Sequence, residues 1–156
     1  MLARRLATLD RFSGGRVIAG LGQGWQHNEF ETANVSSSRK GARTEEFITA
    51  MRSAWCPDPV RHEGEFYRIA PSQVNPKPVQ VRIPVLLATN SPAAIKRAGR
   101  IADGLIPITS SAQELRGIVS AFHDPARGLQ AADVDQWLGL LGEVIEAACH
   151  LGVLAP

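Results

Sequence analysis

The fold is decided by the stretch RVIAGLG, residues 16–22, a short and almost wholly apolar run bounded by glycines. Strands of this kind, without alternating polar residues, are typical of parallel sheets that are covered on both faces. Residues 83–88, IPVLLA, predict a second such strand, and residues 105–108, LIPI, predict a third, which its proline marks as short. We therefore expect a parallel sheet.

Helical patterns alternate with these runs. Leu2, Leu6 and Leu9 fall on one face of a first helix, which a pair of glycines ends. Residues 23–41 are polar and indicate a loop. Apolar residues then recur at helical spacing over residues 44–55, until two prolines forbid continuation of the helix.

The middle of the chain predicts a hairpin and a capped helix. Residues 60–69 hold two short runs on either side of a glycine, which is the pattern of a small hairpin. Ser91 and Pro92 then supply the N-cap and the first residue of a helix. The inward face of that helix is expected to consist of Ile95, Ala98, Gly99 and Ala102.

Two more helices are expected after the third strand. Ser111 and Glu114 form a capping-box pattern ahead of the first, and apolar residues from Val134 to Ala148 line one face of the second. Strand and helix thus alternate three times, as in parallel α/β proteins. Since a complete eight-stranded barrel takes roughly 250 residues, the sequence predicts either an open sheet or a piece of something larger.

The composition excludes several kinds of partner and site. The 17 basic and 15 acidic residues are scattered along the chain, so we expect no nucleic-acid partner. Cys56 and Cys149 show neither a CxxC pair nor a Cys/His spacing, which argues against a metal site and against a disulfide framework. No apolar run approaches the roughly 20 residues of a membrane helix. We expect no membrane partner and a cytoplasmic location.

Two short segments are candidates for ligand binding. The loop GLGQG, residues 20–24, fails the dinucleotide fingerprint, because the third glycine would fall at Trp25. It is equally well explained by a strand end where helices or a ligand approach closely. Asn90 and Ser91 precede a helix, the usual setting for a phosphate, but simple N-capping by Ser91, which contributes about 1 kcal/mol, explains them better when they are judged alone.

Several motifs occur in the order and near the spacing of one known family. They are LDRFSGGRVIAGLGQGW (residues 9–25), GARTEE (41–46), HEGEFY (62–67), NPKPVQ (75–80), NSPAA (90–94) and ADG (102–104). Together they resemble the luciferase-like monooxygenase superfamily, and within it the branch that uses the deazaflavin coenzyme F-420. The resemblance covers residues 2–109. It identifies the chain, residues 1–156, as a single-domain fragment, an incomplete copy with a divergent helical tail over residues 110–156.

The resemblance implies both a fold and a cofactor. The implied fold is α/β, a partial TIM (β/α) barrel with about three parallel strand-helix units and a small hairpin insertion. The implied cofactor is coenzyme F-420 or FMN, lying across the C-terminal ends of the strands, where barrel enzymes place their chemistry. The implied activity is that of an oxidoreductase or monooxygenase, with hydride transfer between the reduced cofactor and an unknown small organic substrate.

The resemblance also assigns residues to the site. The cofactor contacts that it implies are Gln23, Gly24, Asn28, Asn90, Ser91 and Ala93. Trp25 stands where some relatives carry a catalytic glutamate, and the histidine credited with proton transfer lies on an earlier strand of the family barrel. The catalytic residues therefore stay unknown.

Two other functions stay open. A truncated, non-catalytic remnant or interaction module would keep the fold without turnover. An unrelated phosphate-binding α/β domain would keep the site at Asn90 and Ser91 without the flavin. In either case edge strands present unpaired backbone groups, so we expect a tendency to form homodimers.

Overall fold

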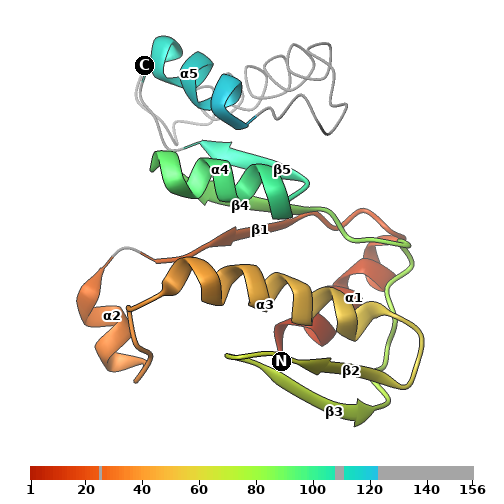
Figure 1. Ribbon diagram of the computed structural model, residues 1–156. Coiled ribbons are helices and arrows are strands. Elements are labelled where there is room, and N and C mark those ends of the chain that lie inside the picture. The colour runs from red at the N-terminus through yellow and green to blue at the C-terminus, as the bar shows by residue number, and fades with distance from the viewer. Residues whose placement is uncertain (25, 108–110, 123–156) are drawn as a thin grey trace.

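The computed structural model describes residues 1–24, 26–107 and 111–122 (Figure 1). Its elements in chain order are α1 (Leu2–Ser13), β1 (Ala19–Gly22), α2 (His27–Thr32), α3 (Lys40–Trp55), β2 (Val60–Glu63), β3 (Arg68–Ser72), β4 (Val85–Thr89), α4 (Pro92–Ile101), β5 (Gly104–Pro107) and α5 (Ala112–Phe122). The last predicted helix, Val134 to Ala148, lies outside these residues. Within them, no helix is long and apolar enough to cross a membrane.

The three predicted strands pair as one parallel sheet in the order β1-β4-β5. Ala19 aligns with Val85, and Leu86 aligns with Gly104. The antiparallel hairpin of β2 and β3 is inserted between α3 and β4. The α/β class, the three strands and the hairpin are therefore confirmed.

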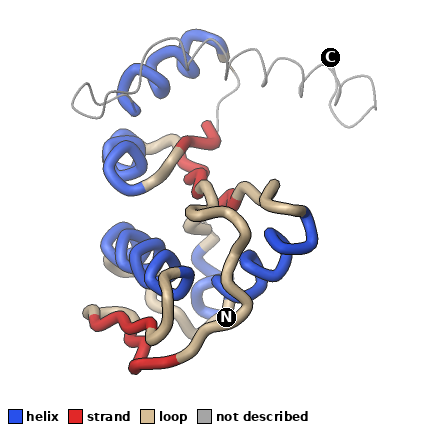
Figure 2. Tube along the Cα trace, turned by 90° about the vertical axis from the view of Figure 1, so that its right-hand side faces the viewer, coloured by secondary structure: helices blue, strands red, loops and turns tan. Residues whose placement is uncertain are grey.

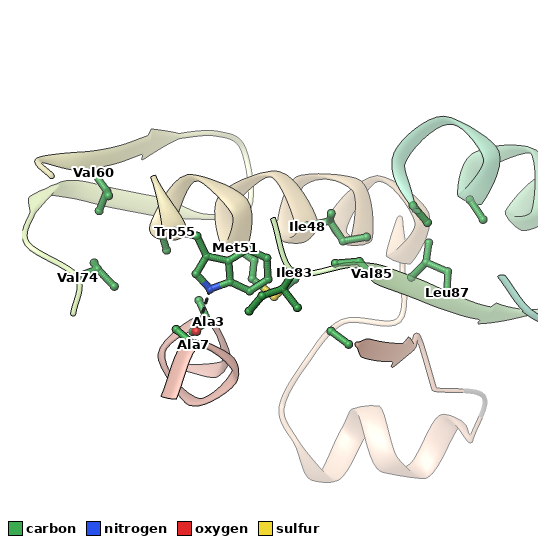
Figure 3. Packing of buried hydrophobic residues seen from close by; sticks show 14 residues of the cluster. Ala3, Ala7, Ile48, Met51, Trp55, Val60, Val74, Ile83, Val85 and Leu87 are labelled. Atoms are coloured by element: carbon green, nitrogen blue, oxygen red, sulfur yellow. Dashed lines mark hydrogen bonds between the residues drawn. The ribbon is translucent and has the colours of Figure 1, made fainter. Parts of the chain in front are cut away.

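Helices cover one face of this sheet. Helices α3 and α4 lie next to each other on the same side of the strands (Figure 2). Val85 and Leu87 of β4 are buried in the cluster that α3 covers (Figure 3). On the other face, Ile18 just before β1 and Ile106 of β5 are 56% and 38% exposed. The expectation of a sheet covered on both faces is thus wrong for the described residues, although the strands are apolar on both.

Helix α1 is rotated away from the face that its leucines define, and of the three only Leu6 packs against the core. Ala3, Ala7 and Asp10 are buried, whereas Leu2 and Leu9 are 38% and 55% exposed. The small alanines let α1 approach α3 closely, and the Nε1 of Trp55 on α3 donates a hydrogen bond to the carbonyl of Ala3 at 3.0 Å (Figure 3). The contact with Trp55 and the burial of Asp10 set the rotation of α1, and neither is visible in the leucine spacing.

Asp10 is a buried anchor at the end of α1. Its Oδ2 accepts the backbone N–H groups of Val79 and Gln80 at 2.8 and 2.9 Å, and its Oδ1 accepts the Gln80 side chain at 2.7 Å. The N–H of Val17 also donates to Oδ1, at 3.4 Å. Burial opposes ionisation of Asp10, but the hydrogen bonds from Gln80, Val79 and Val17 outweigh it and lower its pKa. One carboxylate thus joins α1, the entry to β1 and the segment before β4.

Several element boundaries differ from the sequence-based expectation, most clearly at β1 and α3. Strand β1 begins at Ala19 instead of residue 16, and α3 begins at Lys40 instead of residue 44. The loop expected over residues 23–41 contains the short helix α2, which buries no residue. Without an apolar stripe, α2 leaves no periodic signal in the sequence.

Candidate functional site

The carboxyl ends of the three strands meet at one edge of the sheet. Gly22 of β1 aligns with Ala88 of β4, and Thr89 of β4 aligns with Pro107 of β5. The segments that follow β1 and β4, beginning at Gln23 and Asn90, therefore leave the sheet at the same edge, on the left in Figure 1. Parallel α/β proteins bind ligands at this edge.

The start of α4 offers hydrogen-bond donors at this edge. Ser91 occupies the predicted N-cap position and Pro92 the first turn, but the Ser91 side chain makes no capping hydrogen bond, so capping does not explain this serine. The N–H groups of Ala93 and Ala94 lie in the first turn, where a helix provides no carbonyl partner. Asn90, Ser91 and Ala93 are all exposed. The donors of Asn90, Ser91 and Ala93 are thus accessible to an anion, whereas Ala94 is buried.

The loop after β1 is tied to α3. The Nε2 of Gln23 donates a hydrogen bond to the Oγ1 of Thr44 at 2.9 Å, so one of its two amide donors is engaged. Gly24 has a φ of 74°, and a Cβ there would lie 3.4 Å from the ring of Phe30. The positive φ favours glycine at this position, whereas the distance to Phe30 is an ordinary van der Waals contact.

Asn28 lies apart from the other candidates. It is exposed on α2 and lines a shallow hollow together with Glu29, Thr32 and Ala33. His27 on the same helix is also exposed, with its Nε2 3.5 Å from the Oε1 of Glu31. Within the described residues, no group of three or more His, Cys, Asp or Glu side chains gathers to hold a metal ion.

A groove between α4 and α5 adds residues that the sequence did not suggest. It has a volume of about 370 Å³ and is lined by Asn90, Pro92, Ile95, Glu114, Gly117, Ile118 and Ala121. The predicted cap of α5 is confirmed, because the Oγ of Ser111 accepts the N–H of Glu114 at 3.2 Å. The capping pattern revealed the helix, but nothing in it showed that α5 flanks Asn90.

The chain matches the family model of luciferase-like monooxygenases over residues 1–141. It is 41% identical over 106 residues to an uncharacterised protein of Mycobacterium tuberculosis, an alignment that covers 67% of this chain and 38% of that protein. It is 34% identical over 107 residues to the FMNH2-dependent dimethylsulfone monooxygenase of Pseudomonas putida, covering 66% and 30% of the two chains. With the F420-dependent glucose-6-phosphate dehydrogenase of Amycolatopsis mediterranei it shares 32% identity over 118 residues, covering 74% and 35%.

Solved structures agree with these sequence relationships. The monooxygenase RslO1 from Streptomyces bottropensis superposes with a TM-score of 0.70 and 29% identity, over 81% of this chain and 40% of that one. An F420-dependent secondary alcohol dehydrogenase in complex with an F420-acetone adduct gives a TM-score of 0.72 and 25% identity, over 81% and 39%. The described strands and helices therefore form part of a TIM (β/α) barrel, as the resemblance implied. The chain spans between 30% and 38% of the length of the three curated relatives named above.

Proposed function

This chain belongs to the luciferase-like monooxygenase family, and on that premise we propose that it holds FMN or coenzyme F-420 at the carboxyl edge of β1, β4 and β5. The cofactor class comes from relatives whose names state a dependence on FMNH2 or F420. The observation that carries the proposal is the uncapped first turn of α4, beside exposed Asn90 and Ser91.

The residues at this edge fit the phosphate of such a cofactor. The Ser91 hydroxyl, the Asn90 amide and the N–H groups of Ala93 and Ala94 are all donors, and the positive end of the α4 dipole favours an anion. At the end of β1, a Cβ on Gly22 would meet nothing among the described residues nearer than the Cβ of Ala88, at 4.0 Å. The strand end therefore leaves room for a ligand to approach its backbone.

The protein's part in the proposed reaction is to bind and orient the cofactor. A flavin or deazaflavin supplies hydride transfer when bound, in this case to or from a small organic substrate. Asn90 and Ser91 hold its phosphate, with Ala93 beside them. Gln23 and Gly24 border the ring, and Asn28 supplies a polar contact further out. We assign no catalytic acid or base.

Titration of the purified chain with FMN and with coenzyme F-420, followed by fluorescence, tests this proposal. We expect saturable binding of one of them. The double substitution Asn90→Ala/Ser91→Ala should weaken that binding about a hundredfold or more, since hydrogen bonds to a charged group contribute about 1.5–3 kcal/mol each. Ser111→Ala is the matched control, because Ser111 caps the neighbouring helix and should leave affinity unchanged.

Absence of binding by either cofactor up to about 1 mM, a Kd that corresponds to only about 4 kcal/mol, would contradict the proposal. A cofactor reduction assay then separates an enzyme from a non-catalytic binding module. Homodimer formation stays a prediction. It is supported by the unpaired edges of β1 and β5, the outer strands of the sheet among the described residues. Light scattering tests it.

A further inference from the structure

The segment between Gly24 and α3 has little support of its own. The described residues 26–39 include α2, and none of them is buried. A segment without buried apolar contacts has low local stability. It nevertheless begins next to Gln23 and Gly24, so its placement shapes the carboxyl edge of the sheet.

Three cations at the start of α3 hold this segment. The Nζ of Lys40 lies 5.6 Å from the ring centroid of Phe30. The Nη1 of Arg43 donates a hydrogen bond to the carbonyl of Ser36 at 2.5 Å. Arg39 itself ends the segment and occupies the N-cap position of α3.

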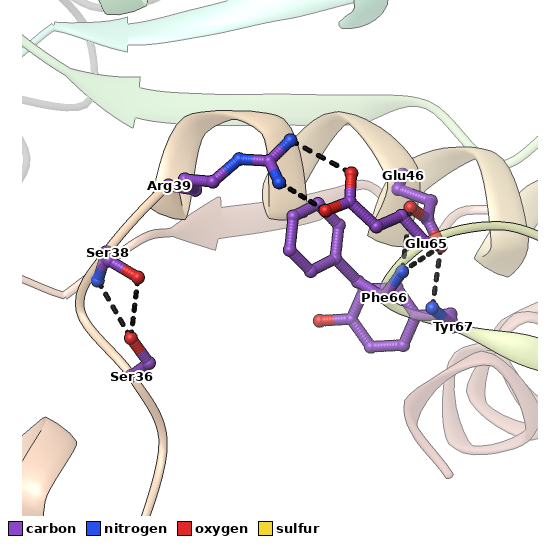
Figure 4. A network of polar contacts seen from close by, with 7 residues as sticks. All are labelled: Ser36, Ser38, Arg39, Glu46, Glu65, Phe66 and Tyr67. Atoms are coloured by element: carbon purple, nitrogen blue, oxygen red, sulfur yellow. Dashed lines mark hydrogen bonds and ion pairs between the residues drawn. The ribbon is translucent and has the colours of Figure 1, made fainter.

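The loop that joins β2 and β3 contacts two of these cations, Arg39 and Arg43. We call residues 64–67 the hairpin tip. Glu65 binds the guanidinium of Arg39 through two hydrogen bonds, of which the Nη2 to Oε2 bond is 2.9 Å (Figure 4). The guanidinium carbons of Arg39 and Arg43 lie 5.1 and 5.2 Å from the ring centroid of Phe66.

The hairpin tip is itself fixed on α3 by Glu46. This carboxylate accepts the N–H of Phe66 at 2.9 and 3.0 Å and the N–H of Tyr67 at 2.6 Å (Figure 4). A Cβ on Gly64 would clash with the Oε1 of Glu46, so a larger residue there would displace the carboxylate from its present position. Burial opposes ionisation of Glu46, but the hydrogen bonds from Phe66 and Tyr67 outweigh it and lower its pKa.

We propose that the hairpin tip is a positioning element for residues 26–39. Glu65 and Phe66 hold Arg39 and Arg43, and through them keep the polar segment at the carboxyl edge of the sheet. Glu65 and Phe66 act through the segment and need not touch a ligand. The identity of the ligand bound at this edge, FMN or coenzyme F-420, rests on the proposed function.

The stacking on Phe66 carries more of this effect than the ion pair. The side chains of Arg39 and Glu65 are 58% and 56% exposed, and an exposed ion pair contributes little. Phe66 is partly buried and packs against two guanidinium groups at once, which favours cation–π attraction. Phe66→Leu removes this attraction, whereas Phe66→Tyr keeps it.

Hydrogen–deuterium exchange on the full chain tests the positioning role. In Phe66→Leu we expect the amides of residues 26–39 to exchange about fivefold to tenfold faster, because two exposed cation–π contacts are lost. Phe66→Tyr and Glu63→Gln should stay within about twofold of the wild type. Glu63→Gln is the matched control, since it breaks a hairpin ion pair, with Arg68 at 3.4 Å, outside the tip. Glu65→Arg should also speed exchange, because it places a second positive charge beside Arg39.

Cofactor affinity gives a second readout. If the wild type binds FMN or coenzyme F-420, Phe66→Leu should raise the Kd about threefold to tenfold, and Phe66→Tyr should not. Unchanged exchange of residues 26–39 in both Phe66→Leu and Glu65→Arg would overturn the inference, as would faster exchange spread evenly over the chain. If the wild type binds neither cofactor, the proposed function fails, while the exchange data still decide the role of the tip.

Discussion

The amino and carboxyl ends of the sheet are held in opposite ways. At the amino end, the Asp10 carboxylate binds the segments that enter β1 and β4. Asp103, just before β5, accepts the N–H of Val85 at 2.9 Å and hydrogen bonds from Arg52 and Arg82 at 2.8 and 2.6 Å. At the carboxyl end, Asn90 and Ser91 are exposed and the first turn of α4 is uncapped.

This difference separates stability from binding. The groups at the amino end satisfy one another, so their removal should cost folding free energy. The donors at the carboxyl end have been left available, so their removal should cost ligand affinity and little stability. Barrel enzymes divide their two faces in this way.

The largest predicted effect is the loss of folding stability in Asp10→Ala. It leaves the partly buried N–H groups of Val79 and Gln80 without their acceptor, and we expect the free energy of unfolding to fall by about 3 kcal/mol. Urea denaturation measures this loss. Asp10→Asn keeps one acceptor oxygen and should cost about half as much. A loss below about 1 kcal/mol in Asp10→Ala would show that the amino end does not depend on this anchor.

Acid should also lower the free energy of unfolding through Asp10, but by less than Asp10→Ala does. Because hydrogen bonds lower the pKa of folded Asp10 below 3.8, its contribution is complete above about pH 5 and is lost as the pH falls through the folded pKa. Asp58, whose pKa Lys77 lowers, titrates in the same window. Unfolding free energies of the wild type and Asp10→Asn should therefore converge below about pH 4. Parallel curves would contradict the assignment to Asp10.

The smallest predicted effects on folding stability concern Ser91 and Ser111, each of which directly precedes a helix. Ser111→Ala removes a capping bond to the N–H of Glu114 and should lower the free energy of unfolding by about 1 kcal/mol. Ser91→Ala removes no capping bond and should change it by less than about 0.5 kcal/mol. Chemical denaturation of the two variants sharpens the comparison. Equal losses would mean that Ser91 serves stability.

The fold was largely predictable because its strands are short apolar runs between glycines and prolines. That pattern predicted the positions of β1, β4 and β5. The helical periodicity between the strands predicted that they run parallel. The rotation of α1 was not predictable, because apolar residues lie on two of its faces. Leu9 is 55% exposed while Ala7 is buried, and the contact with Trp55 and the burial of Asp10 decide between the faces.

The site was predictable only in part. The sequence placed Ser91 at the start of a helix, and register brings the segments after β1 and β4 to one edge. Their role in cofactor binding stays a prediction. The contact of Phe66 with Arg39 joins residues that no local pattern connects. It arises from the insertion of the hairpin beside α3, which sequence spacing cannot reveal.

The Asp10 anchor also has a consequence for synthesis of the chain. Asp10 meets partners 69 and 70 residues further along, so α1 and β1 are made long before the segment that fixes them. At typical rates of translation the interval is roughly 4 to 14 seconds. Throughout that time the apolar run of β1 has been made without β4 to pair with, and exposed apolar surface of this kind favours aggregation or chaperone binding.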